Sequence, residues 1–317
     1  MLPTATSALR ADEIAGAFGL GSPAVLEGPV ARGEQGQVWR LTTPSGAFAV
    51  KQSFTPVDPA EAELDAAFQD AAFAAGLPLP RVLRTTEGRV LAELAGGTVR
   101  VHTWVDVLPV DRTLDPAEIG RLLAALHAVV VPTTEPIHPW YVDPVGAEAW
   151  AELIADITTA GAPFAGDLAA VVPRVLDVER ILVRRPATQV CHMDLWADNV
   201  RRTPAGGLIV LDWENCGPGD PSQELANALF EFGGGDSDRM AALATAYREA
   251  GGPGRVTGLP DLTMLVAQLG HIGEMASRRW LAEPDPVERL HLEGWVREFL
   301  DQPVTREVAE GIVAAVR

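Results

Sequence analysis

The chain has 317 residues, of which 47% are hydrophobic and 21% are charged, a balance that supports a sizeable core in one large or two medium domains. A formal net charge of −18 at pH 7 argues against a nucleic-acid partner. No apolar run reaches membrane length, the N-terminus lacks the apolar stretch of a signal peptide, and two cysteines cannot form a disulfide framework. We therefore expect a cytoplasmic protein that has no membrane partner.

The first hundred residues alternate strand-like runs with a single long helix. Residues 1–20 predict a short outer helix, and Asp58-Pro59 is a typical helix start, with a capping side chain followed by proline, for a helix that runs to about Ala75. The strand-like runs cover residues 25–26, 38–42, 47–52, 82–84, 89–94 and 99–105. Together they predict a mostly antiparallel sheet with one covering helix.

Two features of this region favour phosphate binding. Gly33 and Gly36 lie in a predicted hairpin between two strands, where backbone N–H groups can approach a phosphate closely. One strand later comes Lys51, the only lysine in the sequence. A general preference for arginine explains the missing lysines but not the retained one, and a compact ammonium suits a nucleotide phosphate.

An acid on the helix of residues 58–75 is expected to pair with Lys51. Leu64 and Phe68 are expected to define the buried face of this helix, and Glu61 and Asp65 lie close to that face, with Glu63 well round from it. The sequence leaves open whether Glu61 or Asp65 is the partner, or whether all of these acids are solvated.

Beyond a polar connector at 109–114, a helix over 116–131 begins a mainly helical region. This region is interrupted by the stretch 190–214, the most informative part of the chain. A short buried strand at 190–191 precedes a polar loop, and a hairpin over 200–211 leads from Asn199 at one foot to Asp212 at the other.

The polar residues of this stretch have the spacing that phosphoryl transfer requires. Asp194 is the candidate for the catalytic base that orients a hydroxyl, and Asn199 and Asp212 are candidates for Mg²⁺ ligands, since Mg²⁺ prefers a few hard oxygen ligands from protein. His192 is expected to brace the loop, and Cys191 and Cys216 are expected to be reduced packing residues.

The set of motifs resembles the aminoglycoside phosphotransferase and choline kinase-like family, a branch of the protein-kinase-like fold. The resemblance covers roughly residues 20–300, and the motifs occur in family order. They are the hairpin with Gly33 and Gly36, Lys51, the acidic helix, Leu-Pro-Leu-Pro-Arg-Val at 77–82, Leu122 to His127, His192-x-Asp194-x4-Asn199, and Asp212-Trp-Glu214. The short glycine loop and His102 at the position of the interlobe hinge depart from the family pattern.

The resemblance implies an α+β, two-lobed kinase that acts on small molecules and uses ATP or GTP with Mg²⁺. Residues 1–105 would form the nucleotide-binding lobe and residues 106–317 the lobe with the catalytic loop and the acceptor pocket. Backbone groups at about Thr103 and Val105 would meet the nucleotide base, and Asp220 would be structural.

Family members select their acceptors with helices of the second lobe. The candidates for the acceptor pocket lie mainly on a predicted helix over 261–282. They are the face with Gln268, His271 and Arg278, together with Glu274 and Trp196. The alternative is an ordinary polar surface stripe with no role in binding.

The acceptor itself stays open at this stage. The acidic composition favours a cationic acceptor, such as an aminoglycoside antibiotic, by electrostatic steering, although a need for solubility explains the charge equally well. A metabolic kinase for choline-like, homoserine-like, sugar or ketosamine acceptors, and a nucleotide-binding pseudokinase, are the alternatives. A metal-dependent hydrolase would leave Lys51 and the glycine hairpin without a role. A monomer and a dimer are both compatible with the sequence.

Overall fold

The computed structural model describes residues 9–33 and 36–317, and the chain divides into two compact units. The first contains Met1–Asp111 and His192–Gly217, and the second contains Arg112–Cys191 and Pro218–Arg317. The expected lobe boundary at residues 105 and 106 stays a prediction. The two compact units do not divide at this boundary, because residues 192–217 hydrogen-bond to the N-terminal part of the chain. For example, the Val210 N–H donates to the Pro78 carbonyl at 2.9 Å.

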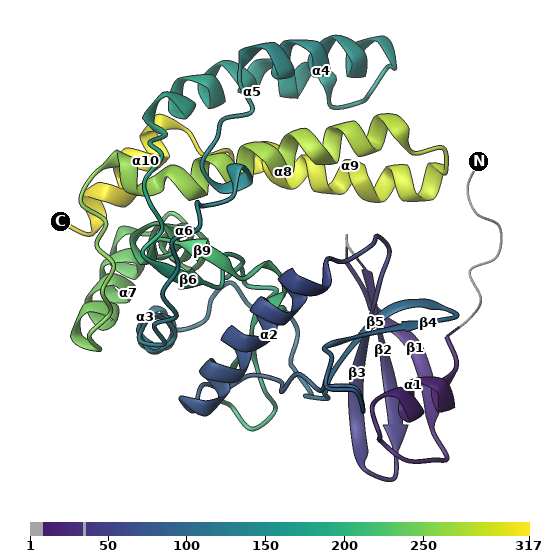
Figure 1. The fold of residues 1–317 in the computed structure, drawn as a ribbon. Coiled ribbons are helices and arrows are strands. Elements are labelled where there is room, and N and C mark those ends of the chain that lie inside the picture. The colour runs from purple at the N-terminus through teal and green to yellow at the C-terminus, as the bar shows by residue number, and fades with distance from the viewer. Residues whose placement is uncertain (1–8, 34–35) are drawn as a thin grey trace. The chain divides into compact units, whose positions relative to one another are not determined.

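Five antiparallel strands form the sheet of the first unit, in the order β1-β2-β3-β5-β4 (Figure 1). They are β1 (Val25–Arg32), β2 (Gly36–Thr43), β3 (Gly46–Ser53), β4 (Leu91–Leu94) and β5 (Gly97–Thr103). Successive side chains of a strand point to opposite faces. In β3, Phe48 and Val50 therefore enter an apolar core with Ile14 of α1 (Ala11–Ala17), and Lys51 lies on the other face.

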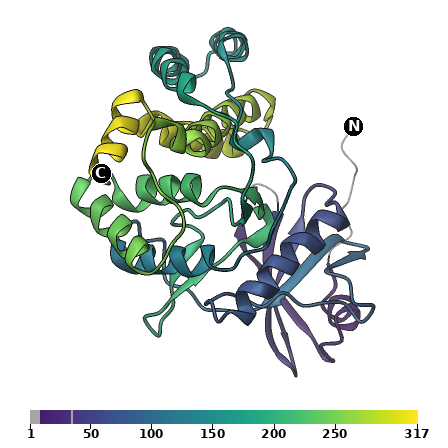
Figure 2. The same cartoon turned by 60° about the vertical axis from the view of Figure 1, so that its left-hand side comes forward.

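The helix α2 (Pro59–Ala74) crosses one face of this sheet (Figures 1 and 2). It begins as predicted, because the Asp58 side chain accepts a hydrogen bond from the Ala60 N–H at 2.8 Å. The prediction for its buried face is partly wrong, because Phe68 is buried but Leu64 is 72% exposed. The buried positions on this helix are Ala62, Asp65, Ala66, Phe68, Gln69 and Ala72. An α-helix turns by about 100° per residue, so Leu64 points roughly 120° away from the middle of this buried face. Its side chain therefore faces solvent.

The hairpin of the stretch 192–217 is present and closes as expected. Strands β7 (Val200–Arg202) and β8 (Leu208–Val210) pair in antiparallel register, with Val200 opposite Val210. At the feet of the hairpin, the Leu211 N–H donates to the Asn199 carbonyl at 2.7 Å. A short 3-10 turn, η3 (Trp213–Asn215), follows, and Trp213 packs against Phe68 of α2 with ring centroids 5.6 Å apart.

The second unit is mainly helical. Its helices are α3 (Pro116–His127), α4 (Ala147–Thr159), α5 (Ala165–Val178), α6 (Pro221–Gly233), α7 (Ser237–Glu249), α8 (Thr263–Ala282), α9 (Pro286–Asp301) and α10 (Arg306–Ala315). Short 3-10 turns and strands occur at η1 (Pro139–Tyr141), η2 (Glu179–Ile181), η4 (Leu259–Leu262), β6 (Gln189–Cys191) and, crossing the unit boundary, β9 (Gly217–Gly219). A core around Trp150, Phe164 and Trp280 joins α4, α5, α8 and α9. In Figure 1, α8 and α9 run side by side. No helix in the described part of the chain is long and apolar enough to cross a membrane.

Candidate active site

The buried side chain of His192 stabilises the loop between β6 and β7. Its Nε2–H donates to the Leu211 carbonyl at 3.1 Å, and its ring meets Trp213 edge-on at 5.0 Å between centroids. Among the described non-glycine residues, Met193 and Asp212 are the two with a left-handed backbone, at φ of 66° and 54°. Such a conformation costs about 1–3 kcal/mol in a non-glycine residue and tends to occur at functional sites.

Asp194 accepts hydrogen bonds from two amide side chains. The Nδ2 groups of Asn199 and Asn215 donate to its Oδ2 at 2.9 and 3.1 Å. Burial, and then the negative charge of Asp212, raise the pKa of Asp194 to about 7, against the opposing effect of Asn215, Lys51 and Asn199. A carboxylate with a pKa near neutrality can accept a proton from a hydroxyl at physiological pH.

The residues at the hairpin feet fit a Mg²⁺ ion. Asn199 donates from Nδ2 to both the backbone oxygen and the Oδ2 of Asp194, at 2.9 Å each, which fixes the amide and leaves Oδ1 as its ligand atom. Asp212 supplies a carboxylate beside that of Asp194, and the two repel each other electrostatically. A hard-oxygen donor set with excess negative charge is the environment that Mg²⁺ prefers.

Lys51 pairs with two acids that follow the hairpin. Its Nζ lies 2.8 Å from Asp212 Oδ1 and 2.6 Å from Glu214 Oε2. Burial alone would lower the pKa of Lys51, but the two carboxylates outweigh it and raise the pKa well above its usual value. The ammonium is therefore charged at any physiological pH.

The expected pairing of Lys51 with Glu61 or Asp65 of α2 is wrong, because Lys51 pairs with Asp212 and Glu214. Asp65 instead forms an ion pair with Arg100 of β5, with 3.4 Å between Oδ2 and Nη2, and Glu61 is exposed. The helical phase did predict that Asp65 points inward. It did not reveal that Arg100, the cross-strand neighbour of Lys51, would be the cation that Asp65 meets. Burial raises the pKa of Asp65 to about 7, although Arg100 opposes this shift.

The glycine hairpin joins β1 to β2. The Gly33 N–H donates to the Gly36 carbonyl at 2.9 Å, which closes the turn; residues 34–35 at its tip lie outside the described residues. A Cβ atom on Gly36 would lie 2.4 Å from the carbonyl oxygen of Gln52 in β3. Gly36 is thus required for the close approach of two backbones.

The residues expected at the hinge lie at the end of β5. The Thr103 N–H donates to the Arg81 carbonyl at 2.9 Å, and Val105 follows the strand in an irregular, half-buried segment. His102 is half-buried, and burial, followed by the positive charges of Arg100 and Lys51, lowers its pKa to about 3. Its imidazole is therefore neutral and can present a polar group without adding charge.

The candidate acceptor residues divide between the two units. Trp196 is half-buried in the loop that precedes β7, in the first unit. In the second unit, Gln268 is buried and accepts from Asn227 at 2.8 Å, and Glu274 pairs with Arg278 one helical turn later. His271 is half-buried, with its Nε2 3.0 Å from the Asp143 carbonyl and its ring stacked on Trp140 at 5.0 Å. Of these three residues of the second unit, His271 and Glu274 retain accessible surface.

Three residues of the site were not singled out from the sequence. Glu214 was quoted as part of the motif Asp212-Trp-Glu214 but given no role, and Asn215 follows it directly. Their position next to a metal-ligand candidate was the available signal. Arg100 had no such signal, because an arginine in a strand is ordinarily exposed and only the register places it beside Lys51.

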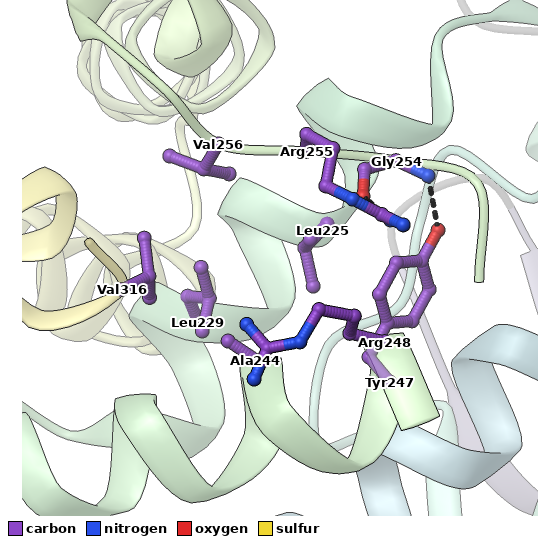
Figure 3. Close-up of a pocket in the computed structure, with 9 residues that line it drawn as sticks. All are labelled: Leu225, Leu229, Ala244, Tyr247, Arg248, Gly254, Arg255, Val256 and Val316. Carbon is purple, nitrogen blue, oxygen red and sulfur yellow. Dashed lines mark hydrogen bonds between the residues drawn. The ribbon is translucent and has the colours of Figure 1, made fainter. Parts of the chain in front are cut away.

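Two features of the second unit do not form a ligand site. A hollow of about 40 Å³, bordered by Tyr247, Arg248 and Arg255 (Figure 3), has room for only a few water molecules. His127, Cys191 and Glu224 bring potential metal ligands within 4.8 Å of one another. However, His127 uses both ring nitrogens in hydrogen bonds of 2.7 Å, to Glu224 and to Tyr247.

Solved structures resemble the fold over nearly its whole length. An aminoglycoside phosphotransferase from Alicyclobacillus acidocaldarius has a TM-score of 0.59 at 16% sequence identity, with 90% of each chain covered. A spectinomycin phosphotransferase in complex with ADP and spectinomycin has a TM-score of 0.57 at 13% identity, covering 96% of this chain and 97% of that one. The choline kinase of Streptococcus pneumoniae has a TM-score of 0.53 at 16% identity, covering 87% and 93%. The fold is therefore the α+β, protein-kinase-like fold of these enzymes.

A model of the phosphotransferase enzyme family matches residues 28–259, and the chain belongs to this family. No curated protein matches the sequence. The predicted fold class, the predicted family and the predicted activity class, a small-molecule kinase, are confirmed at the level of family membership.

Proposed function

We propose that this protein transfers the γ-phosphate of ATP or GTP to a hydroxyl group of a small molecule, with Mg²⁺ as cofactor. The observation that carries this proposal is the arrangement of Lys51, Asp212 and Asn199 around one end of a hairpin, with Asp194 beside them. Nucleotide complexes of similar proteins support it, because a spectinomycin phosphotransferase was solved with ADP and an amicoumacin kinase with AMP-PNP.

In this mechanism the chain contributes positioning and charge. Lys51 and the backbone of Gly33 and Gly36 steady the phosphates, and Asn199 and Asp212 hold the metal. Mg²⁺, when bound, neutralises charge on the phosphates during transfer. Asp194 accepts a hydrogen bond from the acceptor hydroxyl, aligns it for in-line attack and takes its proton. Asn199 and Asn215 hold the Asp194 carboxylate in place for that step.

A cationic acceptor is the class that we propose. The net charge of −18 attracts cations at long range, and Glu274 and the stacked pair of Trp140 and His271 offer an acid and aromatic faces in the second unit. Antibiotic inactivation is then one role and phosphorylation of a metabolite such as an amino alcohol is another. A protein that consumes ATP is expected to act in the cytoplasm, as a monomer or a dimer.

The replacement Asp194→Asn tests the proposal. We expect it to lower kcat by at least about 100-fold, the loss that follows removal of a general base, while the Kd for nucleotide stays within about threefold. The measurement is a coupled assay of ADP or GDP release with a panel of aminoglycosides, amino alcohols and sugars. It is run with and without EDTA, which should abolish turnover by removing the metal.

The matched control is Asp198→Asn, which changes an exposed aspartate of the same loop and should leave kcat unchanged. Acceptor-dependent turnover that persists in Asp194→Asn would refute the role of Asp194. Tight nucleotide binding by the wild-type protein without turnover on any acceptor would favour the pseudokinase alternative.

A further inference from the structure

Arg100 is a buried cation beside the candidate phosphate-binding lysine. Only 3% of its surface is exposed, and the register of β3 and β5 places it directly opposite Lys51. Residues opposite each other in an antiparallel pair project to the same face of the sheet. Two positive charges therefore lie side by side where the sheet meets α2.

Burying a guanidinium is costly unless carboxylates compensate its charge. Arg100 has two such partners, from different parts of the fold. Its Nη2 lies 3.4 Å from Asp65 Oδ2 of α2, and its Nε lies 3.9 Å from Glu214 Oε1 of η3. Its Nη1 is buried and donates no hydrogen bond to any described residue. Hydrogen bonds therefore do not account fully for the burial of Arg100. The interaction that its surroundings provide is the attraction between its positive charge and the carboxylates of Asp65 and Glu214.

Glu214 connects this cation to Lys51. One of its oxygens, Oε2, lies 2.6 Å from the Lys51 ammonium, and the other faces Arg100. Lys51 has a second partner in Asp212. If Asp212 serves the metal, as proposed above, Glu214 is the carboxylate that remains to hold Lys51.

We propose that Arg100 is a positioning residue for phosphate binding. Together with Asp65 it holds Glu214 in the orientation that aims Lys51 at the nucleotide. The series of ion pairs Asp65–Arg100, Arg100–Glu214 and Glu214–Lys51 then replaces a direct contact between an acid of α2 and Lys51. This inference rests on the proposed function, since it gives Lys51 a nucleotide phosphate to bind.

The test compares ATP binding and catalysis in variants of Arg100. Arg100→Met removes the charge and keeps the length of the side chain, and Arg100→Lys keeps the charge. We expect Arg100→Met to raise the Kd for ATP at least about tenfold, in EDTA as well as with Mg²⁺, as loss of a buried charge partner does. In Arg100→Lys the Kd should return to within about threefold of wild type, because the charge beside Glu214 is restored.

The matched control is Arg84→Met. Arg84 pairs with Glu63 and Asp70 of α2, the helix that also carries Asp65, and no ion pair links Arg84 to Glu214. Its loss should lower the melting temperature but leave the Kd for ATP within about twofold, because Lys51 keeps its surroundings. Adding Asp65→Asn to Arg100→Met should weaken ATP binding no further. The effects of substitutions at residues that act through one another do not add.

Each outcome bears on the proposal. An Arg100→Met protein that melts at a lower temperature but binds ATP like wild type would show that Arg100 only ties α2 to the sheet. If this variant does not fold, Arg100→Gln, which retains amide donors, takes its place with the same expectation. A wild-type protein that binds neither ATP nor GTP would overturn the proposed function itself and the role of Arg100 with it. If it binds GTP alone, the same variants are compared with GTP.

Discussion

Three aspartates of this protein, two of them buried and Asp194 half-buried, show how surroundings set the pKa of one residue type. Asp194 and Asp65 lose hydration without full compensation, so burial raises the pKa of each to about 7. For Asp261, burial likewise acts to raise the pKa, but hydrogen bonds outweigh it and leave the pKa below its usual value. The donors are the backbone N–H groups of Thr257 and Gly258, the Thr257 hydroxyl and Arg185. The first two aspartates are suited to proton transfer or charge coupling and the third to stabilising the fold.

Asp261→Asn is therefore expected to destabilise the second unit in a pH-dependent way. Because the folded-state pKa of Asp261 is depressed, its contribution is fully present above the unfolded pKa near 4 and is lost as pH falls through the folded value. Replacing this hydrogen-bonded charge should cost about 2 kcal/mol at pH 7 and progressively less below pH 4. Urea denaturation at pH 7 and pH 3.5 measures both, and an equal loss at the two pH values would contradict the linkage.

At the scale of elements, local signals predicted where α2 starts and where the hairpin of β7 and β8 closes. Errors arose where a distant partner decides. The helix expected over 116–131 ends at His127, and further along the Val131 carbonyl accepts a hydrogen bond from Val190, which is far away in sequence. The strand expected at 82–84 became a single bridge, because pairing needs a partner strand and not only a suitable sequence.

The glycine hairpin of β1 and β2, in which Gly36 also lies against β3, supplies a prediction at this scale. Gly36→Ala should lower the free energy of unfolding by about 1–3 kcal/mol, the usual effect of overpacking, because its Cβ would meet the Gln52 carbonyl oxygen at 2.4 Å. The same displacement should raise the KM for ATP, since Gly36 closes the turn proposed to approach the phosphates.

Gly33→Ala is the matched change in the same hairpin. Within the described part of the chain, the atom that its added Cβ would meet is the Gly36 carbonyl oxygen, 4.0 Å away, so the free energy of unfolding should change by less than about 0.5 kcal/mol. Thermal or urea unfolding of the two variants decides the matter. Equal losses would show that Gly36 is not constrained by contact with β3.

For the whole molecule, the dominant property is the net charge of −18. Electrostatic attraction between a charged protein and a distant ligand is screened by salt, with a Debye length of about 10 Å at 0.1 M. If the acceptor is cationic, kcat/KM for it should fall several-fold between about 0.02 and 0.3 M NaCl, and kcat should change little. A neutral hydroxylated acceptor assayed beside it serves as the control, and parallel salt profiles for both would exclude steering.

The sequence by itself predicted most of the elements and the residues proposed to carry the chemistry. Asp194, Asn199, Asp212 and Lys51 were proposed from residue type and spacing, because metal binding and proton transfer allow few side chains. A short hairpin brings Asn199 and Asp212 together. Only the tertiary structure decided the partners of Lys51 and Asp65. Those contacts join β3, β5, α2 and η3, and strand register and helix packing, rather than any local pattern, decide which charges become neighbours.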